Sequence, residues 1–505
     1  MLSQRGLGHI KESVDLIKKN QGKAVDIHDI LAIKQDERVR AQLRSGHCIG
    51  CFYIESPAMR GLLKKLRCDD YQHLVAASSI IRPGVAKSGM MKEYIRRFHS
   101  PHSFEYLHPV FKEHLGETFG VMVFQEDVMK IVHHFAGLGL DESDMLRRLM
   151  SGKKRGDDKF ELLRKKYFEN CHSIGHPEVL SQEVWRQVES FAGYSFCKAH
   201  SASYAVESFQ SLYLKAYFPL EFMTAVINNF GGFYRTEYYF HEARMAGAAI
   251  HAPCVNHSEH LTSLQGTDLF TGFIHLSQME HAAVQRLVAE RRRGGVFRSL
   301  ADFVSRVEIS SGQLDLLIRI GAFRFTGMTK CELMWEKNAV FNPKTPGGMA
   351  NATGLLFTDL HETYDLPKLE EGEFDQAFDE IELLGFPLRS PFELLADPVA
   401  GCEGIEAADL KKCVGKAVVL IGYYVTRKDV RTVKNELMHF GTWLDREGQF
   451  FDTVHFPFFL KTSPFRGKGI YRIEGKVTEE YGFPSVEVVK MERLPFRRDE
   501  RYPES

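Results

Sequence analysis

The sequence contains no apolar run close to the ~20 residues that a membrane-spanning helix needs. It also lacks an excess of one charge, because 65 lysines and arginines are balanced by 66 aspartates and glutamates, which leaves a net charge of −1. Composition alone therefore does not indicate a nucleic-acid binder, and such a role depends on local basic patches. The cysteines, an odd set of nine scattered over 505 residues, predict reduced thiols rather than a disulfide framework. We expect a cytoplasmic protein without a membrane anchor.

The chain has ample material for large cores. Hydrophobic residues make up 44% of it and include 38 Phe and 18 Tyr. Single cores stop growing at about 250–300 residues, so this length predicts two to four domains. We expect an α+β multidomain protein that is mainly helical and ends in a small β-barrel.

Helical spacing of apolar residues dominates the first 215 positions, with two short strand-like runs at 51–54 and 121–124. Residues 210–228 predict one long amphipathic helix that is interrupted at Pro219. A second helical region runs from about residue 238 to residue 340, where a Pro- and Gly-rich linker begins.

The pattern changes near residue 413. Five short β-rich runs separated by turn residues come one after another, at 418–425, 438–444, 451–456, 471–477 and 485–489. Five strands within about 80 residues predict a small barrel of the oligonucleotide-binding (OB) type.

A basic cluster lies at the end of a predicted helix that starts near Asp141. Its cations are Arg147, Arg148, Lys153 and Lys154, with a glycine between the two pairs. Several converging cations are needed to bind a triphosphate, because its charge is dense and strongly hydrated. The spacing does not match a Walker A loop. The alternative is a solvated helix in which Asp144 pairs with Arg148.

Residues 191–205 combine aromatic, basic, imidazole and hydroxyl groups in one turn-to-helix passage. Such a mixture suits stacking on a base while Lys198 contacts phosphate. The alternative is a tight turn and an amphipathic helix, with His200 hydrogen-bonded in the core.

These two segments occur in order with the motifs at 52–56, 81–84 and 124–129, and the motif at 213–223 comes after them. Together they resemble the fingers of the family C DNA polymerases, the bacterial α subunits. The resemblance implies that Arg147, Arg148, Lys153 and Lys154 contact the incoming dNTP. It places Arg82 and His200 near the nucleotide and the primer end, and it implies primer-template DNA and single-stranded template as partners.

The resemblance also implies catalysis by Mg²⁺ held on palm aspartates. Residues 2–7 match the segment directly after one such aspartate in the family, so we expect this ligand to fall one residue before Met1. The adjacent pairs Asp69–Asp70 and Asp157–Asp158 are interpreted as loop residues. We expect the chain alone to be inactive as a nucleotidyltransferase and to work with a separately encoded N-terminal half. The alternative is a non-enzymatic DNA-binding or clamp-binding protein derived from a polymerase.

The same resemblance divides the chain. Residues 1–228 correspond to the fingers with the end of the palm, 229–340 to a helix-hairpin-helix-like domain, 341–410 to a linker, 411–493 to the OB-fold and 494–505 to a tail.

Within the second domain, Gly321 lies in the second hairpin element, whereas 276–279 has no Gly-x-Gly turn where the family has one. We therefore expect weak DNA binding at the first element. The run Arg291, Arg292 and Arg293 suits a phosphate backbone, or alternatively a solvated helix end.

The linker carries Leu355, Leu356 and Phe357 where the family has a sliding-clamp peptide, and the alternative is a plain apolar anchor. In the barrel, the predicted single-strand contacts are Arg427, Lys428, Arg431 and Lys434. Possible stacking surfaces are Tyr423, Tyr424 and Trp443. The alternative is a structural barrel with a solvated basic rim.

The segment 47–51 has the spacing of half a zinc site, but a second cysteine pair is lacking, so no metal is predicted.

Overall fold

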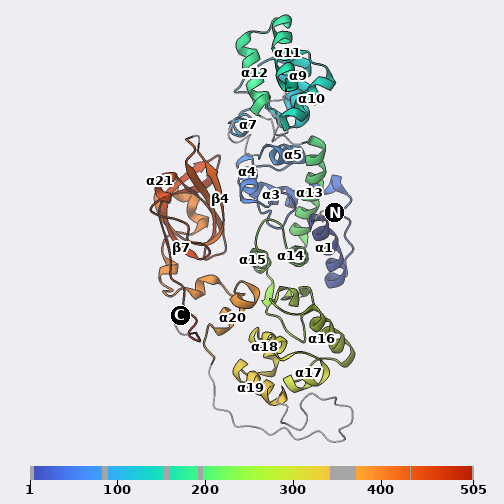
Figure 1. The fold of residues 1–505 in the computed structure, drawn as a ribbon, viewed down its shortest axis with the longest axis vertical. Coiled ribbons are helices and arrows are strands. Elements are labelled where there is room, and N and C mark those ends of the chain that lie inside the picture. The colour runs from blue at the N-terminus through green and yellow to red at the C-terminus, as the bar shows by residue number, and fades with distance from the viewer. Residues whose placement is uncertain are drawn as a thin grey trace.

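The computed structural model describes residues 5–81, 89–151, 158–190, 197–341, 371–432 and 434–502. The molecule is elongated (Figure 1), with a helical tip at one end, a helical body next to it and a smaller helical domain at the other end. A β-barrel lies against one side of the body. The expected α+β multidomain architecture is confirmed.

In the described residues, the regular elements of the body and the tip are helices. The body contains α1 (Arg5–Gln21), α2 (Ile30–Gln35), α3 (Glu37–Ser45), α4 (Pro57–Leu66), α5 (Tyr71–Ile80), α7 (Met90–His99), α13 (Lys198–Tyr217), α14 (Pro219–Asn228) and α15 (Thr236–Met245). The tip contains α8 (Pro109–Leu115), α9 (Gln125–Ala136), α10 (Leu140–Ser151), α11 (Asp158–Ile174) and α12 (Glu178–Ser190).

The predicted break at Pro219 is confirmed. Helix α13 ends at Tyr217, and Pro219 opens α14, where a missing backbone N–H costs nothing. Among the described residues, no helix is both long and apolar enough to cross a membrane.

The prediction of two short strands in this region is wrong. Residues 51–54 form turns, and Tyr53 adopts a left-handed φ of 67° that no strand allows. In the other run the carboxylate of Asp127 accepts the backbone N–H groups of Val123 and Phe124 at 2.8 and 2.9 Å. A buried side chain thus replaces the neighbouring strand that these groups would otherwise need.

The smaller domain carries a three-stranded sheet in the order β1-β3-β2, which the sequence pattern did not predict. Its elements are β1 (Ala249–His251), β2 (Ser263–Gln265), β3 (Asp268–Phe270), α16 (His281–Gly294), α17 (Leu300–Arg306), α18 (Ser311–Arg319) and α19 (Lys330–Phe341), and α20 (Asp375–Leu384) packs on them.

One buried carboxylate holds this domain to α20 and to the last part of the chain. Asp379 on α20 has a side chain only 1% exposed. It accepts from Lys330 at 2.7 Å, Arg319 at 3.0 Å and Arg501 at 3.2 Å. Burial opposes ionisation, but the hydrogen bond from Lys330 and the other two cations outweigh it and lower the pKa of Asp379.

The predicted OB-type barrel is confirmed as a closed barrel with strand order β4-β5-β6-β8-β7. Four of the five β-rich runs lie within a strand, and the run at 451–456 extends one residue past the end of β6. The elements are β4 (Ala417–Arg431), β5 (Leu437–Leu444), β6 (Phe450–His455), α21 (Pro457–Leu460), β7 (Ile470–Glu480) and β8 (Phe483–Arg493). Trp443 lies fully buried in its centre.

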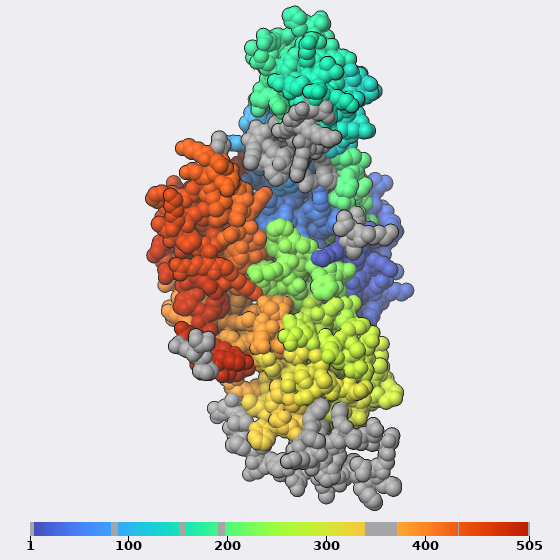
Figure 2. All heavy atoms as spheres, in the orientation of Figure 1, coloured from blue at the N-terminus to red at the C-terminus, as the bar shows by residue number. Residues whose placement is uncertain are grey.

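Helix α15 fastens the barrel to the body. The Tyr238 hydroxyl donates to the Tyr424 carbonyl at 2.7 Å, and Glu237 accepts from the Tyr423 hydroxyl at 3.0 Å. Lys468 adds an ion pair to Glu237 at 2.9 Å. Accordingly, the barrel surface lies directly against the body in Figure 2.

Candidate nucleic-acid interface

Two adjacent side chains at the start of α9 join segments that are far apart in sequence. Gln125 accepts a hydrogen bond from Arg147 of α10 at 3.0 Å. Its neighbour Glu126 accepts the backbone N–H of Lys198, the first residue of α13, at 3.0 Å. The start of α9 therefore brings the basic helix α10 and the N-terminus of α13 to one place.

The two arginines of α10 share one carboxylate. Asp144 pairs with Arg147 and with Arg148, each at 2.7 Å, so the pairing expected for a solvated helix is present. The side chain of Arg148 is nevertheless 73% exposed, whereas that of Arg147 is 23% exposed and turned toward α9. Exposed pairs of this kind contribute little to stability, so an anionic ligand can replace Asp144 at low cost.

The N-terminus of α13 places a second cation and an imidazole beside α9. Lys198 pairs with Glu117 and lies over the ring of Phe124 at 5.3 Å. His200 comes two residues later, and its ring lies 4.0 Å from that of Tyr204. His200 is exposed, so the core position weighed for it from the sequence is wrong.

Tyr204 connects this site to the aromatic motif at 52–56. Its ring packs edge-on against Phe52 at 5.1 Å and Tyr53 at 4.9 Å. A cavity of about 460 Å³ opens beside these rings, and Phe233 lines its far side. The strained backbone of Tyr53 is thus located next to an aromatic cavity, where such strain usually has a functional reason.

In the turn of the first hairpin element, backbone N–H groups are already hydrogen-bonded to other parts of the protein. Ser277 donates to the Leu383 carbonyl at 2.8 Å, and Glu280 donates to Gln313 at 2.8 Å. Gln278 adopts a φ of 64°, so a non-glycine residue occupies the left-handed position of the turn. A phosphate bound here would have to displace these contacts.

The turn of the second hairpin element is covered by α20. Gly321 has a φ of 76°, as a turn glycine should, and its N–H donates to the Ile318 carbonyl at 2.9 Å. A Cβ at this position would lie 3.2 Å from the side chain of Gln376, because α20 crosses the turn.

The arginine run at the end of α16 divides into one structural and two exposed residues. Arg291 donates to the Val255 and Ser258 carbonyls at 2.7 and 2.8 Å, and its side chain is only 10% exposed. Arg292 and Arg293 are 71% and 81% exposed. The two exposed arginines therefore remain candidates for DNA, whereas Arg291 holds the domain together.

The barrel offers a basic ribbon, formed by the paired ends of β4 (427–431) and β5 (437–441) and their connecting turn. Four exposed cations lie on it, namely Arg427, Lys428, Arg431 and Lys434. Arg427 pairs with Asp429 at 3.2 Å and Arg431 donates to the Asn435 carbonyl at 2.9 Å. Lys428 lies directly across from Phe440 in the strand pair.

Two of the aromatic rings proposed for stacking are buried. Trp443 donates to the Thr453 hydroxyl at 2.7 Å inside the barrel, and Tyr423 faces Glu237 of α15. Tyr424 is half-buried against Trp443 and Phe465. These rings belong to the barrel core and to its contact with the body, so the stacking interpretation is wrong for Trp443 and Tyr423.

Comparison with known proteins agrees with this arrangement. Residues 6–175 match the bacterial DNA polymerase III alpha subunit finger domain, and residues 247–333 match a helix-hairpin-helix motif. The DNA polymerase III subunit alpha of Aquifex aeolicus is 30% identical over 465 residues, or 90% of this chain. The chain belongs to the family of bacterial DNA polymerase III α subunits. The finger-domain match runs from α1 to the end of α11.

Two further relatives also carry DNA polymerase names. The DNA polymerase III subunit alpha of Campylobacter jejuni is 29% identical over 83% of this chain, and the error-prone DNA polymerase of Mycobacterium tuberculosis is 32% identical over 64%. The chain spans 38%, 36% and 30% of the length of the Aquifex, Campylobacter and Mycobacterium proteins.

Several predicted α-subunit residues lie outside the described residues. They are Arg82, Lys153 and Lys154 of the nucleotide site and Leu355, Leu356 and Phe357 of the clamp peptide. Their neighbours in the fold are nevertheless described. Ser79, three positions before Arg82, shares a 2.7 Å hydrogen bond with Ser201 of α13. The described end of α5 therefore lies close to α13.

The described part of the α-subunit fold contains no group of three or more His, Cys, Asp or Glu side chains that could hold a metal ion. Asp69 accepts from Arg40 and Arg44, and Asp70 caps α5, so this carboxylate pair is structural. Cys48 and Cys51 are buried, and burial raises the pKa of the Cys48 thiol to about 11. The described residues therefore do not fit the Mg²⁺ that the family implies.

Sequence reasoning missed two exposed rings beside the basic ribbon. The residues Phe440 and Phe458 are 43% and 75% exposed, and α21, which carries Phe458, packs beside β5. The available signal was strand alternation, because Phe440 and Trp443 differ by an odd number of positions and so face opposite sides of β5.

Proposed function

We propose that this chain acts as the fingers, helix-hairpin-helix and OB-barrel portion of a replicative DNA-directed DNA polymerase. In this role it binds the incoming dNTP and the primer-template, and the aspartates that hold Mg²⁺ lie outside it. The observation that carries the proposal is the convergence of Arg147 and Lys198 at the start of α9, with His200 two residues after Lys198 on α13.

The chemistry of these groups suits a triphosphate. Arginine donates in a planar fork to phosphate oxygens, and lysine adds a compact charge. Arg148 is the most exposed of the cations described there, and Asp144 is the group that phosphate oxygens would replace. His200 and Tyr204 lie where a base or sugar would meet an aromatic wall. Lys153, Lys154 and Arg82 complete the set in the proposal.

The proposed contact with single-stranded template is argued from the basic ribbon. Cations along a strand pair with exposed rings beside them are the combination that single-stranded nucleic acid requires. Lys428, Phe440 and Phe458 supply it here. Exposed Arg292 and Arg293 would add contacts to duplex phosphates, and the clamp peptide at 355–357 would tether the polymerase to a sliding clamp.

A primer-extension assay with Mg²⁺ and four dNTPs tests the proposal. We expect no incorporation by the chain alone, and incorporation once a palm-containing N-terminal half is added. Primer-template binding by the chain alone, measured by fluorescence anisotropy, should be present in both cases. Incorporation by the purified chain alone would contradict the proposal that the Mg²⁺-binding aspartates lie outside it. DNA binding without any rescue by the added half would favour the alternative, a DNA-binding protein that is not an enzyme.

A further inference from the structure

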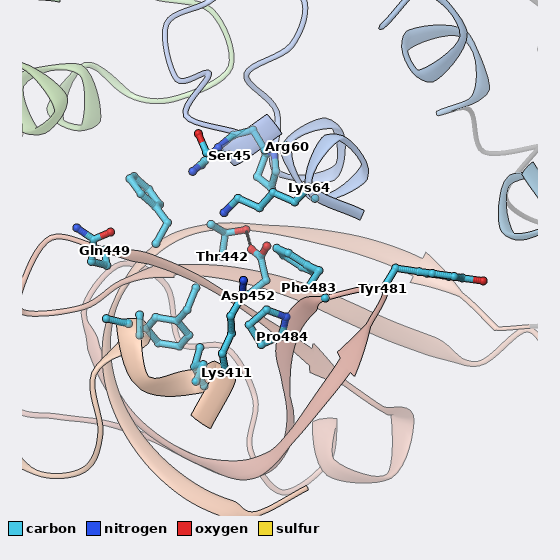
Figure 3. Close-up of a pocket in the computed structure, with 18 of the residues that line it drawn as sticks. Ser45, Arg60, Lys64, Lys411, Thr442, Gln449, Asp452, Tyr481, Phe483 and Pro484 are labelled. Carbon is cyan, nitrogen blue, oxygen red and sulfur yellow. Dashed lines mark hydrogen bonds between the residues drawn. The ribbon is translucent and has the colours of Figure 1, made fainter. Parts of the chain in front are cut away.

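A second cavity, of about 440 Å³, lies between the fingers and the barrel. Helix α4 and the end of α3 form one wall, and the other wall comes from β5, β6, the β7–β8 turn and the short helix η6 (Ala407–Cys413). Figure 3 shows Arg60 and Lys64 reaching in from the fingers, while Lys411 reaches in from the barrel side. This cavity shares no described lining residue with the aromatic cavity near Tyr204.

The cavity carries an excess of positive charge. Within the described parts of the chain, neither Arg60, Lys64 nor Lys411 has an acidic partner within ion-pair distance. Arg60 is only 7% exposed, and its hydrogen bonds go to neutral groups, the Gly46 carbonyl at 2.9 Å and the Tyr234 hydroxyl at 3.2 Å. Burial, and then the neighbouring Arg60, lower the pKa of Lys64. Burial opposes the charge of Arg60, but Glu242 and Asp452 raise its pKa and so offset part of that cost, although neither forms an ion pair with it. A bound anion would stabilise this arrangement further.

Asp452 is the only carboxylate among the described lining residues. It accepts from the Thr442 hydroxyl at 2.6 Å, and burial raises its pKa above the ordinary value. One carboxylate does not balance the charge of three cations. The cavity therefore favours an anion.

The remaining walls suit more than a simple anion. Phe450, Phe451 and Phe483 supply rings, and Gln449 and Thr442 supply hydrogen-bonding groups that could meet a base edge. The volume falls within the range of small-molecule sites, about 300–1,000 Å³, and exceeds the space that one phosphate needs.

We propose that this cavity binds a nucleotide, with Arg60, Lys64 and Lys411 on its phosphates and its base against the phenylalanine wall. The nucleotide is either free or one unit of a single DNA strand. A DNA strand bound at the basic ribbon could continue into the cavity. Phe440 beside the ribbon and Thr442 in the cavity wall lie on the same face of β5, two residues apart. In that form the inference rests on the proposed template contact.

The test compares two matched double variants of the full chain. Lys64→Ala/Lys411→Ala removes the cavity lysines, and Lys165→Ala/Lys476→Ala removes two exposed lysines elsewhere in the fingers and barrel. Binding of a fluorescein-labelled oligothymidylate is measured by anisotropy, and binding of dATP by equilibrium dialysis. If the ligand is a strand, the cavity variant binds the oligonucleotide at least about tenfold more weakly than the control variant. If the ligand is a free nucleotide, only dATP binding falls.

Two further variants keep the outcomes distinct. Lys411→Glu reverses charge at an exposed position, and it should reproduce the loss even if Lys64→Ala perturbs packing. Arg427→Ala/Lys428→Ala removes the ribbon contact. Loss of oligonucleotide binding in the ribbon variant alone, with dATP binding unchanged throughout, overturns the cavity site and leaves the proposed function standing. Equal binding of both probes by the cavity and control variants also overturns it.

Discussion

Arg147 donates a hydrogen bond to the side chain of Gln125 at 3.0 Å, across 22 positions of sequence. This bond joins a cation of α10 to the start of α9, in addition to the ion pair that Arg147 makes with Asp144. Gln125→Ala in a palm-containing enzyme should therefore raise the KM for dNTP less than Arg147→Ala does. The double variant should be no worse than Arg147→Ala alone, because Gln125 acts through Arg147. Additive effects would show that Gln125 contacts the substrate by itself.

Removing the α10 arginines should weaken nucleotide use more than DNA binding. Each lost charge-assisted contact costs about 1.5–3 kcal/mol, so Arg147→Ala and Arg148→Ala should each raise the KM for dNTP about tenfold or more. Arg186→Ala is the matched control, since Arg186 is an exposed tip arginine paired with Glu183 three residues earlier. Steady-state kinetics and primer-template anisotropy measure the two effects. An unchanged KM in both arginine variants would remove them from the site.

The basic ribbon should bind single-stranded DNA in a salt-dependent manner. Each phosphate contact contributes about −0.7 to the slope of log affinity against log salt. Arg427→Ala/Lys428→Ala should therefore flatten the slope by about 1.4. Lys416→Ala/Lys476→Ala, which removes two exposed barrel lysines away from the ribbon, should leave the slope as it is. An equal slope in all three proteins would assign binding to another surface.

The exposed rings beside the ribbon should act by stacking. Phe440→Ala and Phe458→Ala should each weaken oligonucleotide binding by about 1–3 kcal/mol with little change in slope, since no charge is lost. Trp443→Ala should instead lower the unfolding temperature of the barrel, because the ring fills its core. A Trp443→Ala protein that keeps its stability and loses only DNA affinity would contradict this assignment.

Asp379 should be required for the stability of the smaller domain. Replacing it with Asn leaves Lys330, Arg319 and Arg501 without their shared counter-charge, at a cost of about 3 kcal/mol, the lower end for a buried pair. The pKa of Asp379 is lowered in the folded protein, so its contribution is present above the ordinary carboxyl range and disappears as pH falls through the folded value. Thermal unfolding at neutral and acidic pH should show the two proteins converging in acid. A constant difference would point to packing instead.

His455 should make the barrel sensitive to mild acid. Burial lowers its pKa from 6.5 to about 3, so below pH 6.5 the unfolded chain binds a proton that the folded barrel does not. Barrel stability should fall by about 2 kcal/mol between pH 7 and pH 5. Trp443 fluorescence in a Trp185→Phe/Trp335→Phe background reports the transition. The His455→Gln variant should lose this part of the pH dependence, and an identical profile would exclude His455 as its source.

The barrel was predictable because each strand is a local pattern. Alternation fixes which residues share a face, and turn residues mark the ends. Which of the two faces points into the barrel core cannot be predicted from the strand sequence itself. Trp443 was expected to meet DNA, yet it lies on the inward side, and Phe440 and Thr442 lie on the other. A shift by one residue exchanges the two faces, and only the closed barrel decides between them.

The candidate site was predictable only as separate pieces. Arg147, Lys198 and His200 could be singled out by residue type, and the family resemblance joined them. The partners that position them, Gln125 and Glu126, lie 22 and 72 positions away. Likewise, residues 121–124 look like a strand because they are apolar, and the Asp127 carboxylate that satisfies their backbone has no periodic signal.

Strand β4 is a single 15-residue element gripped near its middle by α15 and extended beyond it into the basic ribbon. From Tyr424 to Arg431 the strand advances about 23 Å at its ordinary rise. The ribbon end of β4 therefore extends well beyond the Tyr238–Tyr424 hydrogen bond that attaches this strand to α15. A load on the ribbon would therefore be carried along β4 to its contact with α15.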